Sequence, residues 1–241
     1  MRDTLAAQVE LIWPFEEPLL PDEPGRLLDL ACGTGEFLRR VRPRCSFAVG
    51  VDLFAGHLQF AEGPVVCGNG LQLPFADATF DTVAVRHVLQ ALPDPVPLLA
   101  EARRVLRPGG RLHLIAEDYQ GLFFDGPDVA VENHFAEVAP LFRERGTDLF
   151  QGRRAWRHLR DAGFADVAVR PLLVDNVRGD REAFHNVFRH WGEGYAATLA
   201  ELTGRPLEEM ERRFAAMAEN ASDPVRYCGW LLFAWSGTCP S

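Results

Sequence analysis

The chain has 241 residues, of which 47% are hydrophobic and 24% charged, so it can bury a sizeable core unaided. It has 25 basic residues, all of them arginine, and 34 acidic ones, so the net charge is −9. A protein that binds a phosphate backbone usually presents a basic face, so this balance disfavours nucleic acid as a partner.

Cysteine use and hydropathy point to a cytoplasmic protein. The five cysteines are scattered and none lies in a Cys-x-x-Cys pair, which predicts reduced thiols and no metal site. The N-terminal segment contains acids and lacks the apolar centre of a secretory signal. The longest apolar run, near residues 230–235, is far shorter than the roughly 20 residues that span a bilayer, so we expect no membrane partner.

Strands and helices are expected to alternate through the first half of the chain. An amphipathic helix over residues 2–12 ends at Trp13-Pro14, and a proline-rich linker leads to Gly25. The apolar runs that follow predict strands at 26–31, 46–52, 65–67, 79–86 and 111–117, with helices at 35–42 and 96–106. This alternation is typical of an α/β fold with a doubly wound, mostly parallel sheet and right-handed crossovers.

The second half of the chain predicts helices at 127–145, 152–162, 180–201 and 206–220 and strands at 166–174 and 226–235. About 50 residues link these last two strands, far more than a hairpin needs, which indicates a helical cap. We therefore predict three parts: an N-terminal helix and linker (1–24) as a candidate lid, a core (25–174 and 226–241), and a cap insertion (175–225).

The segment 27–37, LLDLACGTGEF, is the most informative motif. An apolar strand runs into Asp29, then into Gly33-Thr34-Gly35 and the start of a helix. Glycines remove side chains where a ligand approaches backbone amides, and a helix start offers free N–H groups. Asp52 ends the next strand, where an acid can accept hydrogen bonds from both ribose hydroxyls. The pattern predicts a nucleoside-binding site.

Residues 25–120 resemble the class I S-adenosylmethionine-dependent methyltransferases, especially the methyltransferase type 11 or UbiE-like small-molecule group. Four motifs carry the resemblance, at 29–35, 49–52, 73–81 and 104–110. It implies a Rossmann-like sheet of seven strands with an antiparallel last strand, and S-adenosylmethionine as cofactor. It also implies these cofactor-binding residues: Asp29, Ala31, Cys32, Gly33, Thr34, Gly35, Asp52, Leu53, Asn69, Gly70, Leu71 and Arg86.

One position departs from the family pattern. Asn69 stands where the family usually has Asp or Glu, whose side chain accepts a hydrogen bond from the adenine amino group. The amide oxygen of Asn can still accept such a bond. A dinucleotide site is disfavoured, because the third glycine of G-x-G-x-x-G is replaced here by Leu38.

The acceptor is expected beneath the connections 118–150 and 175–225, which leave the cofactor edge of the sheet. Eight aromatic residues are candidates for this roof, although most would form the core of the cap: Tyr119, Phe123, Phe124, Phe135, Phe184, Phe188, Trp191 and Tyr195. His87, Glu117 and Tyr119 follow strand ends and are the candidate catalytic residues. Further histidines, at 134, 185 and 190, are weaker candidates because each could simply be structural.

These features predict in-line methyl transfer to an O, N or C atom of a small molecule, with a general base only if the acceptor arrives protonated. Two alternatives stay open: an RNA or protein methyltransferase, and a module that binds S-adenosylmethionine without catalysis. Monomer and homodimer are equally compatible with the sequence.

Overall fold

The apolar runs pair into one sheet in the computed structural model, which describes residues 2–126 and 129–241. Within them, eight strands are β1 (Gly25–Leu30), β2 (Cys45–Asp52), β3 (Val65–Cys67), β4 (Phe80–Arg86), β5 (Leu106–Ala116), β6 (Leu122–Phe124), β7 (Ala165–Asp175) and β8 (Cys228–Thr238). Their order is β3-β2-β1-β4-β5-β8-β6, and β7 also pairs with β8. The first five strands are parallel, and β8 is antiparallel to β5, β6 and β7.

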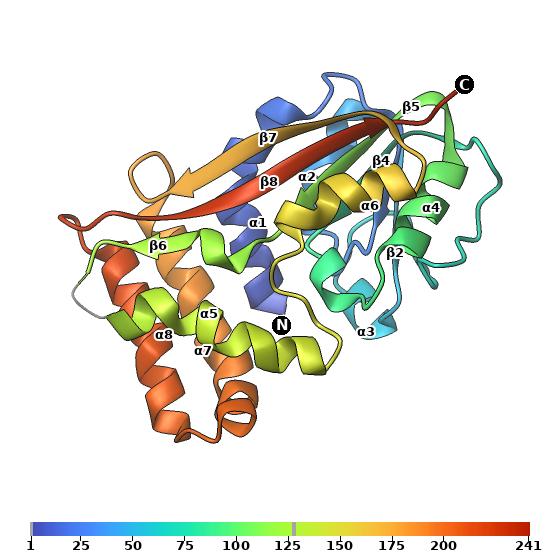
Figure 1. The fold of residues 1–241 in the computed structure, drawn as a ribbon. Helices are drawn as coiled ribbons and strands as arrows, with labels where there is room; N and C mark the ends of the chain where they lie inside the picture. The colour runs from blue at the N-terminus through green and yellow to red at the C-terminus, as the bar shows by residue number, and fades with distance from the viewer. Residues whose placement is uncertain (1, 127–128) are drawn as a thin grey trace.

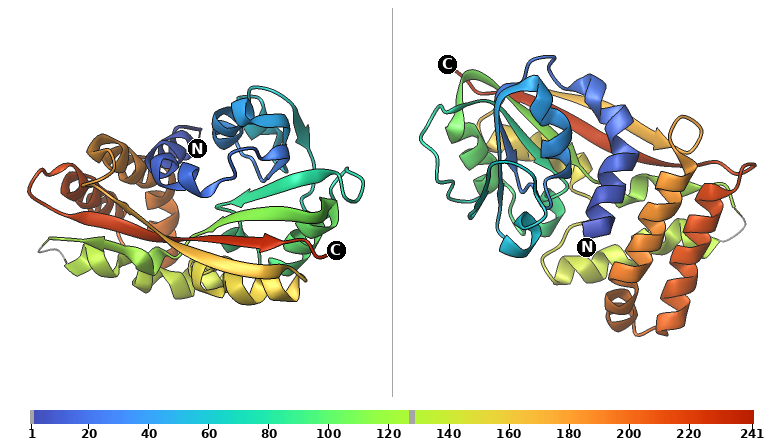
Figure 2. Two further views of the ribbon diagram at one scale, coloured as in Figure 1. Left: turned by 90° about the horizontal axis from the view of Figure 1, so that it is seen from above. Right: turned by 180° about the vertical axis from the view of Figure 1, so that it is seen from behind.

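Helices cover both faces of this sheet (Figures 1 and 2). They are α1 (Arg2–Glu16), α2 (Glu36–Val41), α3 (Ala55–Leu58), α4 (Val96–Val105), α5 (Val129–Glu144), α6 (Ala155–Asp161), α7 (Arg181–Thr203) and α8 (Leu207–Ser222). In Figure 1, α4 and α6 lie in front of the sheet and α1 and α2 behind it. Beside the sheet, α5, α7 and α8 form a helical cap that shares a buried cluster with α1 and β8.

The predicted fold is confirmed: a doubly wound, mostly parallel sheet with an antiparallel last strand and a helical cap. The number of strands differs by one, because β8 extends beyond β5 and its free edge pairs with the short β6. The predicted helix over 127–145 corresponds to α5, and its first two positions lie outside the described residues.

Two boundaries differ because tertiary contacts outweigh local signals. The first helix does not end at Pro14 but continues to Glu16. Proline removes one helical hydrogen bond, yet Ile12 and Glu16 on the same helix are fully buried against the rest of the protein. The fifth strand begins at Leu106 rather than 111, so the turn that closes α4 already belongs to the sheet.

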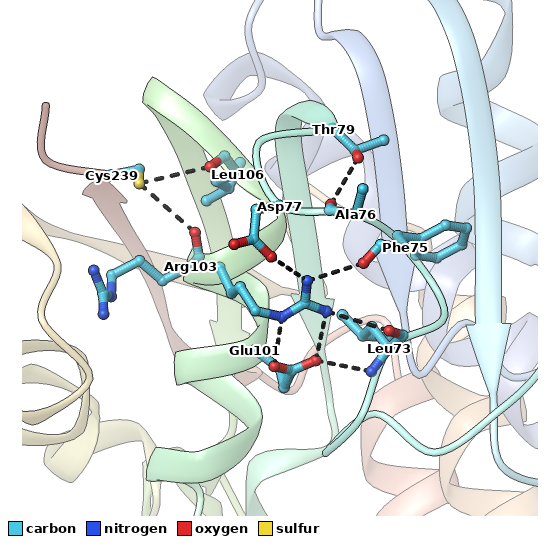
Figure 3. A network of polar contacts seen from close by, with 10 residues as sticks. Leu73, Phe75, Ala76, Asp77, Thr79, Glu101, Arg103, Leu106 and Cys239 are labelled. Carbon is cyan, nitrogen blue, oxygen red and sulfur yellow. Dashed lines mark hydrogen bonds and ion pairs between the residues drawn. The ribbon is translucent and has the colours of Figure 1, made fainter.

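Arg104 on α4 holds the loop of residues 73–79 in place through hydrogen bonds to Leu73, Phe75 and Asp77, three partners that Figure 3 labels. Its guanidinium donates hydrogen bonds to the carbonyls of Leu73 and Phe75, to Asp77 and to Glu101. The bond from Arg104 lowers the pKa of Glu101, which also accepts the Leu73 N–H at 2.8 Å. This network fixes the chain immediately after the segment 68–71, which contributes to the site described next.

Candidate functional site

A cavity of about 790 Å³ opens at the carboxyl edge of the parallel strands. The strand order reverses beside β1, and such a switch point is where ligands bind in open α/β sheets. We call one part the sheet half. The ends of β1 and β2 and the loops after β1, β2 and β3 line it with Asp29, Ala31, Cys32, Gly33, Thr34, Asp52, Leu53, Asn69, Gly70 and Leu71. We call the other part the helix half; it is lined by Gln8, His87, Tyr119, Phe135, Val138, Phe142, Trp191, Tyr195, Leu199 and Phe214.

The loop after β1 brings bare backbone to the cavity. Ala31, Gly33 and Gly35 have φ of 64°, 55° and 78°, the left-handed region that side chains disfavour. A Cβ on Gly33 would lie 3.1 Å from Leu5 of α1. Gly35 does not line the cavity; a Cβ there would come within 2.8 Å of Ala61, so this glycine serves loop packing.

Asp52 closes the sheet half at the end of β2. Its two carboxylate oxygens accept the N–H of Gly33 at 2.8 Å and of Phe54 at 2.9 Å. His57 Nδ1 lies 3.7 Å from the same carboxylate. A carboxylate has about four lone-pair sites, so Asp52 can accept further hydrogen bonds from a ligand.

Asp29 is a buried acid in the sheet half with an unusually high pKa. Its side chain is almost fully buried, and Oδ2 has no hydrogen-bond partner within the described residues. Burial raises the pKa of Asp29 to about 7, and the nearby positive charge of Arg86 offsets only part of that rise. A buried carboxylate without a partner is stabilised by an incoming cation, which makes Asp29 a candidate for binding a positively charged group.

Asn69, Gly70 and Leu71 form the far rim of the sheet half. The Asn69 side-chain oxygen accepts the Leu71 N–H at 2.9 Å and keeps a second lone pair. Leu53 and Leu71 are 60% and 46% exposed, so they offer apolar surface to a flat ligand at the mouth of the cavity. The thiol of Cys32 instead faces Gly50, within the β1–β2 packing.

Arg86 lies in the cavity wall, but its guanidinium is already paired. It donates two hydrogen bonds of 2.7 Å to the carboxylate of Glu16 from α1. His113 of β5 contacts the same carboxylate at 2.8 Å. Burial alone would raise the pKa of Glu16, but Arg86 and His113 hold it well below its usual range. The predicted ligand role of Arg86 stays a prediction, since its two bonds join α1 to the sheet.

The three candidate catalytic residues come together where the two halves meet. His87 Nδ1 lies 2.9 Å from Glu117 Oε1, and Tyr119 donates a hydrogen bond to Glu117 Oε2 at 3.3 Å. Gln8 of α1 donates a third bond to Glu117 at 2.7 Å. His87 and Tyr119 line the cavity, whereas Glu117 is 1% exposed and lies behind them.

The weaker histidine candidates lie outside the cavity wall. Burial lowers the pKa of His134 to about 4, and Arg213 beside it acts in the same direction. His185 bonds the carbonyl of Ala218, and His190 contacts Glu193. Of the eight predicted roof aromatics, Tyr119, Phe135, Trp191 and Tyr195 line the cavity; Phe124, Phe184 and Phe188 are core, and Phe123 contacts Tyr227.

Sequence reasoning missed the polar groups that α1 and β5 supply. Gln8 and Glu16 come from a helix taken only as a candidate lid, and no motif marks them. His113 had a weak signal, because it interrupts an apolar strand and a buried polar side chain needs a partner.

The described residues contain neither a metal-binding cluster nor a helix that could cross a membrane. Across residues 2–126 and 129–241, no group of His, Cys, Asp and Glu side chains could hold a metal ion. In that same part of the chain, no helix combines the length and the apolar character that crossing a bilayer requires.

This chain resembles known proteins both in sequence and in fold. Residues 28–114 match the family model described as a methyltransferase domain. The demethylmenaquinone methyltransferase of Renibacterium salmoninarum is 30% identical over 187 residues, 69% of this chain and 76% of that protein. An uncharacterised 37.1 kDa protein in transposon TN4556 of Streptomyces fradiae is 34% identical over 202 residues, 75% of this chain and 57% of the relative.

A crystal structure of an S-adenosylmethionine-dependent methyltransferase from Thermotoga maritima has the same fold. It superposes with a TM-score of 0.59 at 17% identity, covering 98% of this chain and 91% of that one. The chain spans only 40% to 57% of the length of three curated relatives that it matches.

Proposed function

Because the chain belongs to the S-adenosylmethionine-dependent methyltransferases of the type 11 group, we propose that it transfers a methyl group from this cofactor to a small molecule. One observation carries the proposal: the sheet half and the helix half form a single cavity, with the candidate catalytic residues where they meet. The cofactor supplies an electrophilic methyl group on a sulfonium, and the helix half would bring an O, N or C atom in line with it.

The sheet half fits the chemical groups of the cofactor. Asp29, whose buried Oδ2 has no partner among the described residues, suits the ammonium of the methionine part. Asp52 can accept hydrogen bonds from the ribose hydroxyls while it also holds the backbone N–H of Gly33. Leu53 and Asn69 would contact the adenine at the open rim.

The remaining predicted residues extend this assignment. Ala31, Cys32, Thr34 and Gly35 shape the loop, Gly70 and Leu71 complete the rim, and Arg86 acts through its contact with Glu16. The N-terminal helix α1 would serve as a lid and the α7–α8 pair as a cap, since both contribute to the cavity wall.

A small molecule is favoured over RNA or protein because the helix half is walled by helices from four parts of the chain and is mainly apolar. The net charge of −9 also speaks against a phosphate backbone. A module that binds the cofactor without catalysis would leave the gathering of His87, Glu117 and Tyr119 without a purpose.

Calorimetric titration with S-adenosylhomocysteine tests the cofactor site. We expect micromolar affinity, and Asp52→Ala should weaken it by about 1–3 kcal/mol because a hydrogen-bonded charged partner is lost. Asp22→Ala, at a fully exposed acid outside the cavity, is the matched control. An absence of binding at millimolar ligand would refute the proposal, and binding without turnover of any acceptor would favour the non-catalytic module.

A further inference from the structure

We propose that the acceptor is a neutral, largely apolar molecule carrying an ionisable hydroxyl, such as a phenol, and that His87 backed by Glu117 removes its proton. This inference rests on the proposed methyl transfer and names the substrate class and the general base. Three features of the helix half support it: its lack of free charge, its apolar walls and the orientation of the His87 ring.

Charged acceptors find no partner among the described residues of the helix half. The charged residues in the described cavity wall are Asp29, Glu36, Asp52 and Arg86, and the three acids belong to the sheet side. Arg86 is neutralised by the two bonds from its guanidinium to Glu16. A phosphate or carboxylate on the acceptor would therefore be desolvated without a free cation, and an ammonium without a free carboxylate, both at high cost.

The walls of the helix half suit a ring system. Trp191 and Phe135 lie edge to face with ring centroids 5.9 Å apart, and Tyr119 lies 5.6 Å from Trp191. Phe142 from α5 and Phe214 from α8 also line this half. Aromatic walls of this kind favour flat apolar ligands, which they contact through edge and face.

Two groups lie beside His87 Nδ1: Glu117 Oε1 at 2.9 Å and the amide nitrogen of Gln8 at 3.2 Å. Gln8 makes its shorter bond, 2.7 Å, to Glu117, so we assign the Nδ1 proton to the hydrogen bond with this carboxylate, which only accepts, and the lone pair to Nε2. Gln8 and Tyr119 also donate to Glu117, which keeps the carboxylate in position. Nε2 is buried and has no partner among the described residues, although His87 lines the cavity.

The backbone at His87 is strained in a way that supports a functional role. Its φ of 54° lies in the left-handed region, which a residue with a Cβ adopts only at an energetic cost. The His87 N–H is held by the carbonyl of Ile115 at 3.1 Å. Strain of this kind persists where the surrounding structure enforces it, and here the result is an imidazole at the junction of the two halves.

The chemical step balances with these groups alone and the methyl donor. The hydroxyl proton passes to His87 Nε2 as the acceptor oxygen forms a bond to the methyl carbon. The carbon–sulfur bond breaks with its electron pair moving to sulfur, which yields a methyl ether and S-adenosylhomocysteine. The imidazolium, stabilised by Glu117, then releases the proton to solvent.

A binding experiment tests the substrate class. The complex of the wild-type protein with S-adenosylhomocysteine is titrated with 2-naphthol, 2-naphthoate and 2-naphthylmethylammonium, which share one ring system. We expect naphthol to bind at least tenfold more tightly than either ion. Equal or tighter binding of an ion, or no binding of naphthol, would overturn the proposed class.

A kinetic experiment tests the general base. With S-adenosylmethionine as donor, His87→Asn should lower kcat for 2-naphthol by ~10²–10⁴-fold. The loss should be much smaller for the more acidic 6-cyano-2-naphthol, because that acceptor arrives partly ionised. Glu117→Gln should show the same dependence on acceptor acidity, and it serves where His87→Asn does not fold. His190→Asn, outside the cavity, should behave as wild type.

The outcomes separate the two proposals. Equal losses for both naphthols, or no loss, would show that His87 is merely structural and would overturn this inference. Failure of the wild-type protein to bind S-adenosylhomocysteine at all would instead refute the proposed function.

Discussion

The two halves of the cavity differ in how far apart along the chain their lining residues lie. Three successive strand ends between residues 29 and 71 build the sheet half, and its geometry follows from parallel pairing of β1, β2 and β3. The helix half takes residues from α1, α5, α7 and α8, between residues 8 and 214. The cofactor side therefore depends on local backbone shape, whereas the acceptor side depends on how four helices dock.

One buried cluster joins the halves. Glu16 at the end of α1 is paired with Arg86 of β4 and His113 of β5. The same helix carries Gln8 to Glu117 and Leu5 to the loop at Gly33. Docking of α1 therefore shapes both halves at once.

The largest effect is expected for Glu16→Gln. Removing this carboxylate leaves Arg86 buried without its partner, which costs about 3–5 kcal/mol. Urea unfolding monitored by circular dichroism measures the loss, with Glu17→Gln as control because the Glu17 side chain is 48% exposed. A loss below about 1 kcal/mol, typical of exposed ion pairs, would show that α1 does not depend on this cluster.

Gly33→Val tests the loop after β1, which lines the sheet half of the cavity. The positive φ and the approach of Leu5 leave no room for a branched side chain. We expect affinity for S-adenosylhomocysteine to fall by at least 100-fold, about 2.7 kcal/mol, in a protein that stays folded. Gly194→Ala on α7, where a Cβ meets nothing within 4 Å, is the control. Wild-type affinity in the valine variant would place the ligand away from this loop.

This difference in assembly also explains what the sequence could predict. The loop 29–35 and Asp52 are adjacent motifs on neighbouring strands, so their meeting follows from the alternation of strands and helices. The contacts of Gln8 with Glu117 and of Glu16 with His113 join residues 109 and 97 positions apart. Nothing local encodes such pairs, and Pro14 even indicated a helix end where the helix continues. His87, Glu117 and Tyr119 could be nominated because they follow strand ends, but not the bonds that orient them.

The smallest predicted effect is a pH dependence of ligand affinity, which we expect for the sheet half and not for the helix half. With a pKa of about 7, Asp29 holds its proton below neutrality and is a carboxylate above it. The ammonium of S-adenosylhomocysteine favours the carboxylate, so affinity should rise with pH. Arg86, Glu16 and Asp52 also act on this group, and none of them reverses that direction. Between pH 6 and 7.5 the ionised fraction grows from about one tenth to about three quarters, so Kd should fall roughly eightfold.

Asp29→Asn should abolish this pH dependence. The variant should bind S-adenosylhomocysteine at every pH as weakly as the wild-type protein does when Asp29 is protonated. It should also stabilise the protein without ligand: a raised pKa means that the folded state resists losing a proton, so folding stability declines as pH rises from 3.8 to about 7. Removing that ionisation should raise Tm at pH 8 by at least roughly 2–4 °C, the shift that about 1 kcal/mol produces in a chain of this size. Naphthol binding to the helix half, measured in the same variant, should not vary over this pH range. A Kd for S-adenosylhomocysteine that is equally flat in the wild-type protein would mean that Asp29 does not receive the cationic group.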